Sequence, residues 1–364
     1  MVGGGTPDTT VSSLWNGDIQ WFTPTEVGHQ KYVSKSARTI TQLGLQKSSA
    51  KKLPAGSILL SSRATIGECS IAQRECTTNQ GFQNLIPKKD TNNEFLYYLA
   101  QTKKHHFIKY ASGSTFLEIS NSEIKKTKCT VPGTEEQTQI AAFLSALDDR
   151  IAVQNKIIED LKILKKELCN DHFKSVLHDA SLRYITLKEI LTERKEYCSK
   201  DGTYTHGTLS KEGVAPKTER YDRDFLVKKE DKQYKVTHLN DICYNPANLK
   251  FGVICRNTYG DLIFSPIYVT FEISDNVHPA YIELFLTNQN FIGRIRRYEQ
   301  GTVYERMAVS PEDFLSYETH MPTYEEQVKF ANEMQCIQRK IELETAFLSS
   351  LQNQRRFFLN AMFI

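Results

Sequence analysis

Two stretches of the chain carry the same pattern of apolar positions. From residue 140 and again from residue 330, apolar residues recur at alternating spacings of four and three, the pattern of a helix that packs against another helix. The two seams lie 190 residues apart, and polar residues interrupt both at matching places: Gln154 and Lys165 in the first, Glu344 and Arg355 in the second. We therefore predict two helices of roughly 38 residues, each about 57 Å long.

Each seam needs a partner helix, and the other copy is the obvious partner. The apolar seam residues that we predict to pair the helices are Ile140, Leu144, Leu147, Ile151, Ile158, Leu161, Leu168, Phe330, Met334, Ile337, Ile341, Leu348, Leu351 and Phe358. Both helices open on Pro-x-x-Glu-Glu-Gln, at 132–137 and 322–327, and acidic residues favour the first turn of a helix. The alternative is two unrelated amphipathic helices, each packed on its own domain.

Strand and turn signals dominate the block upstream of each helix. A turn and short strand at 53–60 have a counterpart at 239–244, and a short helical pattern at 95–99 has one at 281–285. We predict an α+β fold in which two strand-rich domains alternate with two long helices that pair as an antiparallel coiled coil, giving a pseudo-two-fold internal repeat. The predicted ranges are 1–134 for the first domain, 135–182 for the central helix and linker, 183–323 for the second domain and 324–364 for the C-terminal helix.

The second block opens with a strand and short helix at 184–191, for which the first block has no counterpart. An offset of 190 places that counterpart before Met1. The first domain is therefore expected to start late or to be truncated.

Composition narrows the class of protein. The 364 residues are 40% hydrophobic, and 46 Lys+Arg against 43 Asp+Glu exclude a protein that coats a polyanion. Residues 1–134 hold 16 Lys+Arg against 9 Asp+Glu, which suits a phosphate-facing surface or simply a domain with extra surface lysines. No apolar run reaches the ~20 residues of a membrane span. The eight cysteines form no C-x-x-C pair, which favours reduced thiols in the cytoplasm over a zinc site or disulfide framework.

Signatures of catalysis are weak. No Gly-Lys pair occurs, so a phosphate-binding loop of the G-x-x-x-x-G-K-[ST] type is absent, and Asn245-Pro246-Ala247-Asn248 lacks the aromatic end of a methyltransferase loop. Glu193-Arg194-Lys195, with Asp179 upstream, resembles the acidic-x-Lys step of a metal-dependent nuclease, but such steps are common by chance. We predict no catalytic residue and no metal site.

Several short motifs occur together in an order typical of one family. In the first half these are Gly4-Gly5-Thr6-Pro7, Trp15-Asn16-Gly17-Asp18-Ile19 with Trp21, Ser61-Ser62-Arg63-Ala64-Thr65-Ile66-Gly67, Asn79-Gln80-Gly81-Phe82 and Gly113-Ser114-Thr115-Phe116 with Glu118-Ile119-Ser120. The second half adds Tyr244-Asn245-Pro246, Gly252 and Ser265-Pro266-x-Tyr268. With the central-helix residues from Pro132 to Ile151, this set resembles the specificity subunit of type I restriction–modification systems.

This resemblance implies a non-catalytic subunit that recognises DNA. Each of two target recognition domains would read one half of a gapped, asymmetric site on double-stranded DNA. Two methyltransferase subunits would dock on the helices and domains, and restriction subunits would join them; no membrane partner is expected. S-adenosylmethionine, ATP and magnesium are expected only on the partner subunits. Helix length and duplex geometry predict a gapped site of about one to one-and-a-half turns.

Candidate DNA-binding residues are polar or cationic side chains in the turns of both domains, which can bond to base edges or phosphates. In the first domain they are Ser61, Ser62, Arg63, Thr65, Asn79, Gln80, Ser112, Ser114 and Thr115. In the second they are Asn245, Asn248, Lys250, Tyr268, Arg294, Arg296, Arg297, Gln300 and Thr302. The small residues could equally serve only to build tight turns, and the basic run at 103–106 could be a phosphate contact or a solvated helix face.

Two other functions remain open at this stage. The late start is compatible with a partial or silent copy of a specificity gene. A coiled-coil scaffold without DNA readout is a third possibility, and it predicts no salt-dependent DNA affinity.

Overall fold

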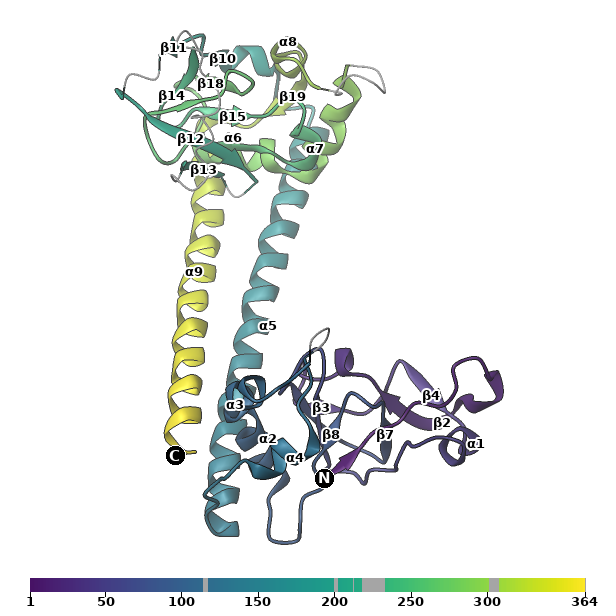
Figure 1. The fold of residues 1–364 in the computed structure, drawn as a ribbon. Coiled ribbons are helices and arrows are strands. Elements are labelled where there is room, and N and C mark those ends of the chain that lie inside the picture. Colours follow the sequence, from purple (N-terminus) through teal and green to yellow (C-terminus); the bar gives the residue numbers. More distant parts are fainter. Residues whose placement is uncertain (114–116, 200–201, 212, 218–232, 301–307, 364) are drawn as a thin grey trace. The chain divides into compact units, whose positions relative to one another are not determined.

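The computed structural model describes residues 1–113, 117–199, 202–211, 213–217, 233–300 and 308–363 (Figure 1). The chain divides into two compact units: unit 1 is Met1–Asn155 with Ala346–Ile364, and unit 2 is Lys156–Thr345. Two long helices, α5 (Thr134–His178) and α9 (Tyr324–Ala361), each contribute one part to either unit. Each unit is therefore built on a segment of both helices.

Unit 1 contains three small sheets, with strand orders β4-β2-β7, β3-β6-β5 and β1-β8. Its strands are β1 Val2–Gly3, β2 Trp15–Phe22, β3 Tyr32–Val33, β4 Arg38–Ile40, β5 Ile58–Leu60, β6 Cys69–Ala72, β7 Cys76–Thr78 and β8 Gln83–Asn84. Its short helices are α1 Gln42–Gln46, α2 Asn93–Thr102, α3 Lys104–Lys109 and α4 Asn121–Lys126. Figure 1 shows α2 and α3 beside α5, with β2, β4 and α1 on the far side of the unit.

Helix α2 attaches the strands of unit 1 to the long helices. The Asn92 side chain caps its start by accepting hydrogen bonds from the N–H groups of Glu94 and Phe95, both at 3.0 Å. The apolar face of α2 then packs against α5: Phe95 and Leu99 share a buried cluster with Ala141. The core of the strand-rich part of unit 1 therefore continues into the helix pair.

Unit 2 is also strand-rich, with sheets ordered β10-β18-β15-β16, β11-β14-β17-β12-β13 and β19-β9. Its strands are β9 Arg183–Thr186, β10 Leu191–Glu193, β11 Tyr197–Cys198, β12 Thr205–Ser210, β13 Gly213–Pro216, β14 Tyr234–Thr237, β15 Ile242–Tyr244, β16 Ile254–Arg256, β17 Leu262–Phe264, β18 Val269–Ile273 and β19 Glu318–Met321. Its short helices are α6 Pro279–Thr287, α7 Gln289–Ile295 and α8 Pro311–Leu315. The α+β fold class, with strand-rich domains alternating with long helices, is confirmed.

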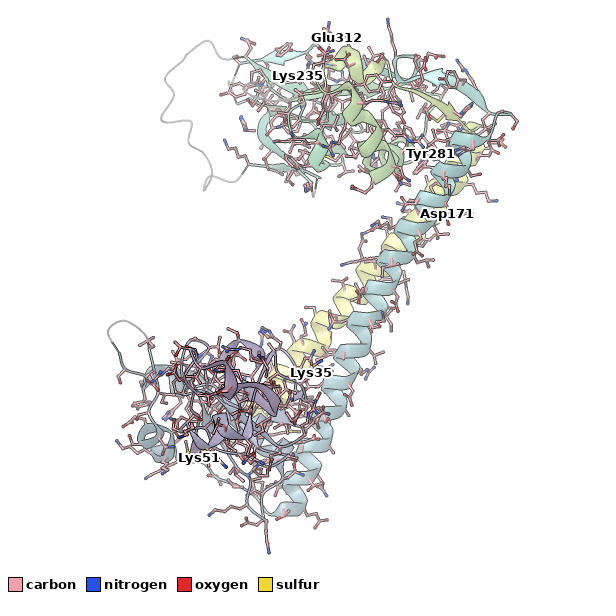
Figure 2. All side chains as sticks on the ribbon, turned by 90° about the vertical axis from the view of Figure 1, so that its right-hand side faces the viewer. Lys35, Lys51, Asp171, Lys235, Tyr281 and Glu312 are labelled. Atoms are coloured by element: carbon pink, nitrogen blue, oxygen red, sulfur yellow. The ribbon has the colours of Figure 1, made fainter. Side chains whose placement is uncertain are left out.

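Aromatic side chains join the long helices to the core of unit 2. Phe173 of α5 lies 5.5 Å from the Tyr281 ring of α6 and 5.8 Å from the Phe330 ring of α9, between ring centroids. His172 stacks on Phe330 at 3.7 Å. Figure 2 shows Tyr281 beside the ends of α5 and α9 in this unit. Burial of these large rings stabilises the last turns of α5 and the first turns of α9.

The repeated Pro-x-x-Glu-Glu-Gln motif performs the same task in both units. The Gln137 side chain donates to the carbonyl of Pro132 (2.9 Å) and accepts from the N–H of Asn92 (2.9 Å), which caps α2. Gln327, 190 residues later, donates to Pro322 (2.9 Å) and accepts from the N–H of His278 (2.9 Å), which caps α6. Both glutamines are buried. Each motif therefore ties the start of a long helix to the start of the short helix that packs on it.

The helices pair antiparallel within each unit. In unit 1 the first turns of α5 meet the last turns of α9, where the rings of Phe143 and Phe358 lie 4.9 Å apart. In unit 2 the last turns of α5 meet the first turns of α9, and Lys165 donates to the Gln338 side chain at 2.9 Å. These are the ends at which antiparallel partners should meet.

The predicted seam residues are buried or half-buried, except Leu168, which is 40% exposed. Cys169 takes the buried position instead, because a straight helix of 3.6 residues per turn drifts away from a strict 3.5-residue repeat. Helix α5 also has 45 residues rather than about 38. Its extra turns are retained because Phe173 and Val176 are buried in unit 2.

None of the helices in the described part of the chain combines the length and apolar character of a membrane span. All eight cysteines are free thiols, and burial raises the pKa of Cys69 and of Cys76 to about 12.

Candidate nucleic-acid interface

The turn between β5 and β6 in unit 1 contains four of the predicted DNA-binding residues. Ser61 Oγ donates to the carbonyl of Arg63 (2.7 Å) and accepts from Thr65 Oγ1 (3.2 Å). Ser61 and Ser62 are both 0% exposed, so their side chains lie inside the turn, and their role in reading DNA stays a prediction that this burial does not favour. Gly67 closes the turn at φ +83°, where a Cβ would lie 2.7 Å from Lys104 Cγ. The serines build the turn, and Thr65 remains exposed on it.

Arg63 connects this turn to a second predicted loop. Its guanidinium forms an ion pair with Glu118 at 2.8 Å, and β-bridges join Glu118 to both Arg63 and Ser112. The structure therefore brings Arg63, Thr65 and Ser112 to one region of unit 1. Ser114 and Thr115 lie outside the described residues. Because Arg63 is half-exposed, its remaining donors stay accessible.

The Asn79-Gln80 loop serves a structural purpose at its first residue. The Asn79 side-chain oxygen accepts the N–H of Gly81 at 2.8 Å. This bond occupies one lone pair of the amide oxygen and orients the side chain within the turn, while the second lone pair and the amide nitrogen are the groups that bidentate recognition of adenine would use. Gln80 is exposed, and its side-chain oxygen accepts from Thr6.

The basic run at 103–106 lies at the join of α2 and α3. Lys104 is ion-paired with Glu68, and the His106 ring lies 4.6 Å from the Tyr110 ring. These contacts favour a solvated helix surface over a phosphate contact.

Unit 2 places most of its predicted residues on two neighbouring segments. In the loop after β15, Asn245 is only 8% exposed and its side chain accepts the N–H of Ala247 at 3.1 Å. Its role in reading DNA stays a prediction that this burial does not favour. Asn248 is exposed, and the Lys250 ammonium lies 5.4 Å from the Phe251 ring centroid. Tyr268 belongs to a separate cluster, where its ring packs 5.4 Å from Phe264.

The second segment is the end of α7 and the turn that follows it. Arg294, Arg296 and Arg297 are all exposed there, and Arg297 lies 5.5 Å from the Tyr298 ring centroid. The Gln300 side chain donates to Asp313 at 2.9 Å, whereas Thr302 lies outside the described residues. Leu249 packs in the same core as Ile295. The fold therefore sets the Asn248–Lys250 loop beside the helix that carries the arginines.

The acidic-x-Lys step at 193–195 has its charges neutralised by neighbours. Glu193 pairs with the buried Lys235 at 3.0 Å, and Arg194 donates to both oxygens of Asp241, at 2.8 and 3.0 Å. Within the described residues, no group of three or more His, Cys, Asp and Glu side chains could hold a metal ion. These carboxylates serve ion pairs inside the sheet region of unit 2.

One exposed cation of unit 1 was not among the predicted DNA-binding residues. Arg38, on the edge strand β4, places its guanidinium 3.6 Å from the ring centroid of Trp15. The two residues are 23 positions apart and meet because β4 pairs with β2. The Trp15–Trp21 motif was visible in the sequence, but no local pattern indicated which cation would cover it.

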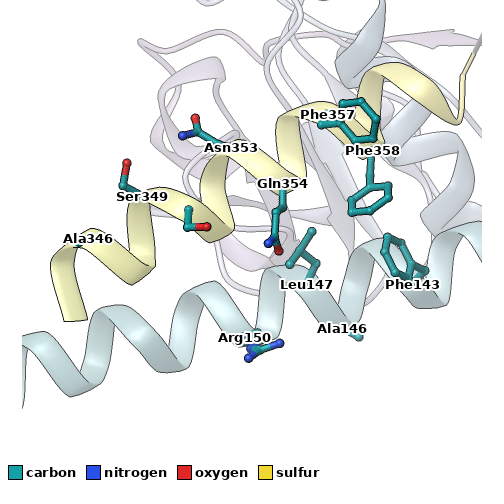
Figure 3. Close-up of a pocket in the computed structure, with 11 residues that line it drawn as sticks. Phe143, Ala146, Leu147, Arg150, Ala346, Ser349, Asn353, Gln354, Phe357 and Phe358 are labelled. Carbon is teal, nitrogen blue, oxygen red and sulfur yellow. The ribbon is translucent and has the colours of Figure 1, made fainter. Parts of the chain in front are cut away.

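An apolar groove lies on the helix pair of unit 1 (Figure 3). Its volume is about 970 Å³, and its lining residues are Phe143, Ala146, Leu147, Arg150, Ala346, Ser349, Ser350, Asn353, Gln354, Phe357 and Phe358. Phe357 is 65% exposed. A large exposed ring beside such a groove is typical of a surface that binds another protein.

Comparison with known proteins agrees with this architecture. Residues 2–163 match the type I restriction modification DNA specificity domain. The specificity subunit of the type I restriction enzyme MjaIX from Methanocaldococcus jannaschii is 40% identical over 177 residues, which make up 48% of this chain and 41% of that protein. The match therefore spans less than half the length of that relative.

Solved structures resemble the whole chain. An S subunit of a type I restriction–modification system from M. genitalium aligns with a TM-score of 0.53 at 16% identity, over 100% of this chain and 96% of that chain. A chain from a structure of type I restriction–modification complex assembly and conformational transition aligns with a TM-score of 0.62 at 14% identity, over 99% and 94%. Residues 2–163 therefore match the type I restriction modification DNA specificity domain, and the chain as a whole shares the fold of solved type I S subunits.

Proposed function

We propose that this chain is the DNA-recognition subunit of a type I restriction–modification complex. Unit 1 reads one half of a gapped, asymmetric site on double-stranded DNA, and unit 2 reads the other half. The observation that carries the proposal is the repeat itself: Gln137 and Gln327 attach two strand-rich units to the helix pair in the same way. The units then differ in their exposed polar residues, so the two half-sites should differ.

The exposed residues of the candidate interface support DNA as the ligand. Arg63 and Thr65 in unit 1, and Arg294, Arg296 and Arg297 in unit 2, are donors that suit phosphates and base edges. The chain carries no chemistry of its own in this proposal. Adenine methylation takes place on a methyltransferase subunit, which binds S-adenosylmethionine, and restriction subunits use ATP and magnesium.

The groove on the helix pair of unit 1 is proposed as part of the methyltransferase docking surface. Phe143 and Phe357 expose aromatic area to solvent there, and apolar residues also remain exposed along α5, including Val153. A partner that covers them would remove this area from water. We place the assembled complex, with two methyltransferase subunits, in the cytoplasm, where the free cysteines stay reduced.

The test is to co-express the chain with the methyltransferase subunit and map methylated adenines across a genome at base resolution. A gapped motif with two different halves is the expected result. A palindrome or a single half-site would mean that only one unit reads DNA. A stable complex that methylates nothing would contradict the proposal and favour a silent gene copy or a scaffold.

A further inference from the structure

Arg38 is held flat against an aromatic ring at the surface of unit 1. Its guanidinium carbon lies 3.6 Å from the Trp15 ring centroid and 5.7 Å from that of Trp21. A guanidinium stacked at this distance gains cation–π attraction while its N–H groups remain in the plane of the group. Those N–H groups therefore point away from the stack rather than into it.

The platform beneath Arg38 is rigid. The indole N–H of Trp15 donates to the carbonyl of Asp8 (2.9 Å), and that of Trp21 donates to the carbonyl of Gly5 (2.8 Å). The two indoles meet edge to face, with centroids 5.0 Å apart and an interplanar angle of 89°. Both rings are buried, so the surface on which Arg38 rests cannot reorient without disrupting a core cluster.

The backbone that carries Arg38 is fixed as well. Ser36 Oγ donates to the carbonyl of Arg38 at 2.6 Å, and the N–H of Ser36 donates to the side chain of Gln20 at 2.8 Å. The N–H of Ala37 donates to the Glu26 carboxylate at 2.7 Å. Arg38 then begins β4, the edge strand of its sheet. The side chain projects from a tethered edge and not from a free loop.

The guanidinium donors of Arg38 are free among the residues that the structure describes. Across the part of the chain that the structure describes, its guanidinium makes no hydrogen bond or ion pair, although the side chain is exposed. Two other cations lie near this segment. Arg74, from the loop between β6 and β7, donates to the carbonyl of Ser34, and Lys35, labelled in Figure 2, is exposed. The Glu26 carboxylate, which bonds to this segment, already accepts hydrogen bonds from the N–H groups of Thr23 and Ala37.

We infer that Arg38 is a DNA contact of unit 1, made by an arginine fork that the two tryptophans hold ready. This inference rests on the proposed function and adds a residue to its recognition surface. The ligand chemistry is a pair of hydrogen-bond acceptors on double-stranded DNA, supplied either by the O6 and N7 atoms of guanine or by a backbone phosphate. Because the stack already orders the side chain, little rotamer entropy is lost when DNA binds.

The experiment uses the full chain in complex with its methyltransferase subunit. Duplexes that carry the mapped site, or an unrelated sequence of equal length, are titrated by fluorescence anisotropy at several KCl concentrations. Arg38→Ala removes the fork, Arg38→Gln removes the charge but keeps a polar side chain of similar length, and Lys89→Ala removes a single exposed charge elsewhere in unit 1. Thermal unfolding of each variant shows whether the fold survives.

Whether Arg38 bonds to guanine or to a phosphate, we expect the Arg38 variants to lose affinity for the target duplex about tenfold or more. Lys89→Ala should bind like the wild type. If Arg38 contacts a phosphate, its loss in the variants should lower affinity equally for both duplexes and reduce the slope of log K against log salt by about 0.9. If Arg38 contacts guanine, its loss in the variants should weaken binding to the target duplex selectively and relax discrimination at one base pair of the unit 1 half-site.

Unchanged affinity and salt dependence in folded Arg38→Ala or Arg38→Gln would overturn the inference and leave Arg38 as a cover over Trp15. That result would leave the proposed function intact, because the wild-type complex would still bind its site. If the wild-type complex binds neither duplex and methylates nothing, the proposed function fails, and the inference fails with it.

Discussion

The phenol of Tyr98 donates a 2.7 Å hydrogen bond to the carboxylate of Asp148, which joins helix α2 of unit 1 to the long helix α5. Arg355 of α9 pairs with the same carboxylate and donates to Gln101 of α2 at 3.0 Å. Burial, followed by the bond to Asp148, raises the pKa of Tyr98 well above its usual value. Three helices of unit 1 therefore share one polar cluster.

The repeat gives this cluster a counterpart in unit 2. Residues 190 positions away from Asp148 and Arg355 are Gln338 and Lys165, and these two also bond, at 2.9 Å. The charged pair of unit 1 thus corresponds to a pair with a neutral amide in unit 2. Polar pairs at matched seam positions can determine the register and orientation of helices at some cost in stability.

Asp148→Ala should destabilise unit 1 by about 2 kcal/mol, because it leaves the largely buried Arg355 without its anion and Tyr98 without its acceptor. Both tryptophans of the chain lie in unit 1, so denaturant unfolding followed by tryptophan fluorescence reports on this unit. Lys52→Ala, which breaks the exposed Lys52–Glu75 pair of unit 1, serves as the control and should leave the transition unchanged. Equal transitions for both variants would mean that the cluster adds no stability.

Ser62→Ala should stabilise unit 1 slightly, by about 1 kcal/mol, because the buried Ser62 hydroxyl has no hydrogen-bond partner among the residues that the structure describes. Ser61→Ala should have the opposite effect, since Ser61 Oγ bonds to both Arg63 and Thr65. The same tryptophan transition measures both variants. If Ser62→Ala instead changes the methylated motif while the protein stays folded, our conclusion that this serine only builds the turn is wrong.

His238 should make unit 2 less stable as the pH rises. Its two ring nitrogens lie 2.8 Å from Asp261 and 3.1 Å from Glu196. Burial lowers the pKa of His238, and Arg194 lowers it further, but the hydrogen bonds to the two carboxylates outweigh them and the pKa is raised above 6.5. The stabilisation from the charged ring is therefore complete below the unfolded pKa and is lost as the pH rises through the folded pKa.

An NMR titration of the His238 ring between pH 6 and 9 measures that pKa, and thermal unfolding over the same range measures its effect. The wild type should lose stability with rising pH more steeply than His238→Gln, which cannot carry the charge. Parallel pH profiles for the two proteins would exclude His238 as the source.

Phe357→Ser should weaken binding of the methyltransferase subunit at least tenfold and leave the fold of the free chain unchanged, because this ring is exposed at the groove. Analytical ultracentrifugation of the mixed subunits measures the loss. Arg356→Ser is the matched control, since Arg356 is the exposed neighbour that does not line the groove. If both variants assemble like the wild type, the partner docks elsewhere.

Periodicity and repetition in the sequence determined the plan of this protein. The two seams and the shared Pro-x-x-Glu-Glu-Gln motif predicted two long, paired helices and two related strand-rich domains, because helix period and capping chemistry act between residues a few positions apart. The motif even identified Gln137 and Gln327, whose matching hydrogen bonds explain why it is repeated.

Only the tertiary structure decided which side chains face solvent and which neighbours they have. Ser61, Ser62 and Asn245 look like DNA-reading residues along the chain, yet their turns bury them. Arg38 has no local signal and gains its role from Trp15, across a strand pairing that spans 23 residues. Burial and pairing of this kind depend on the register of elements distant in the sequence, and no local pattern of residue types contains that information.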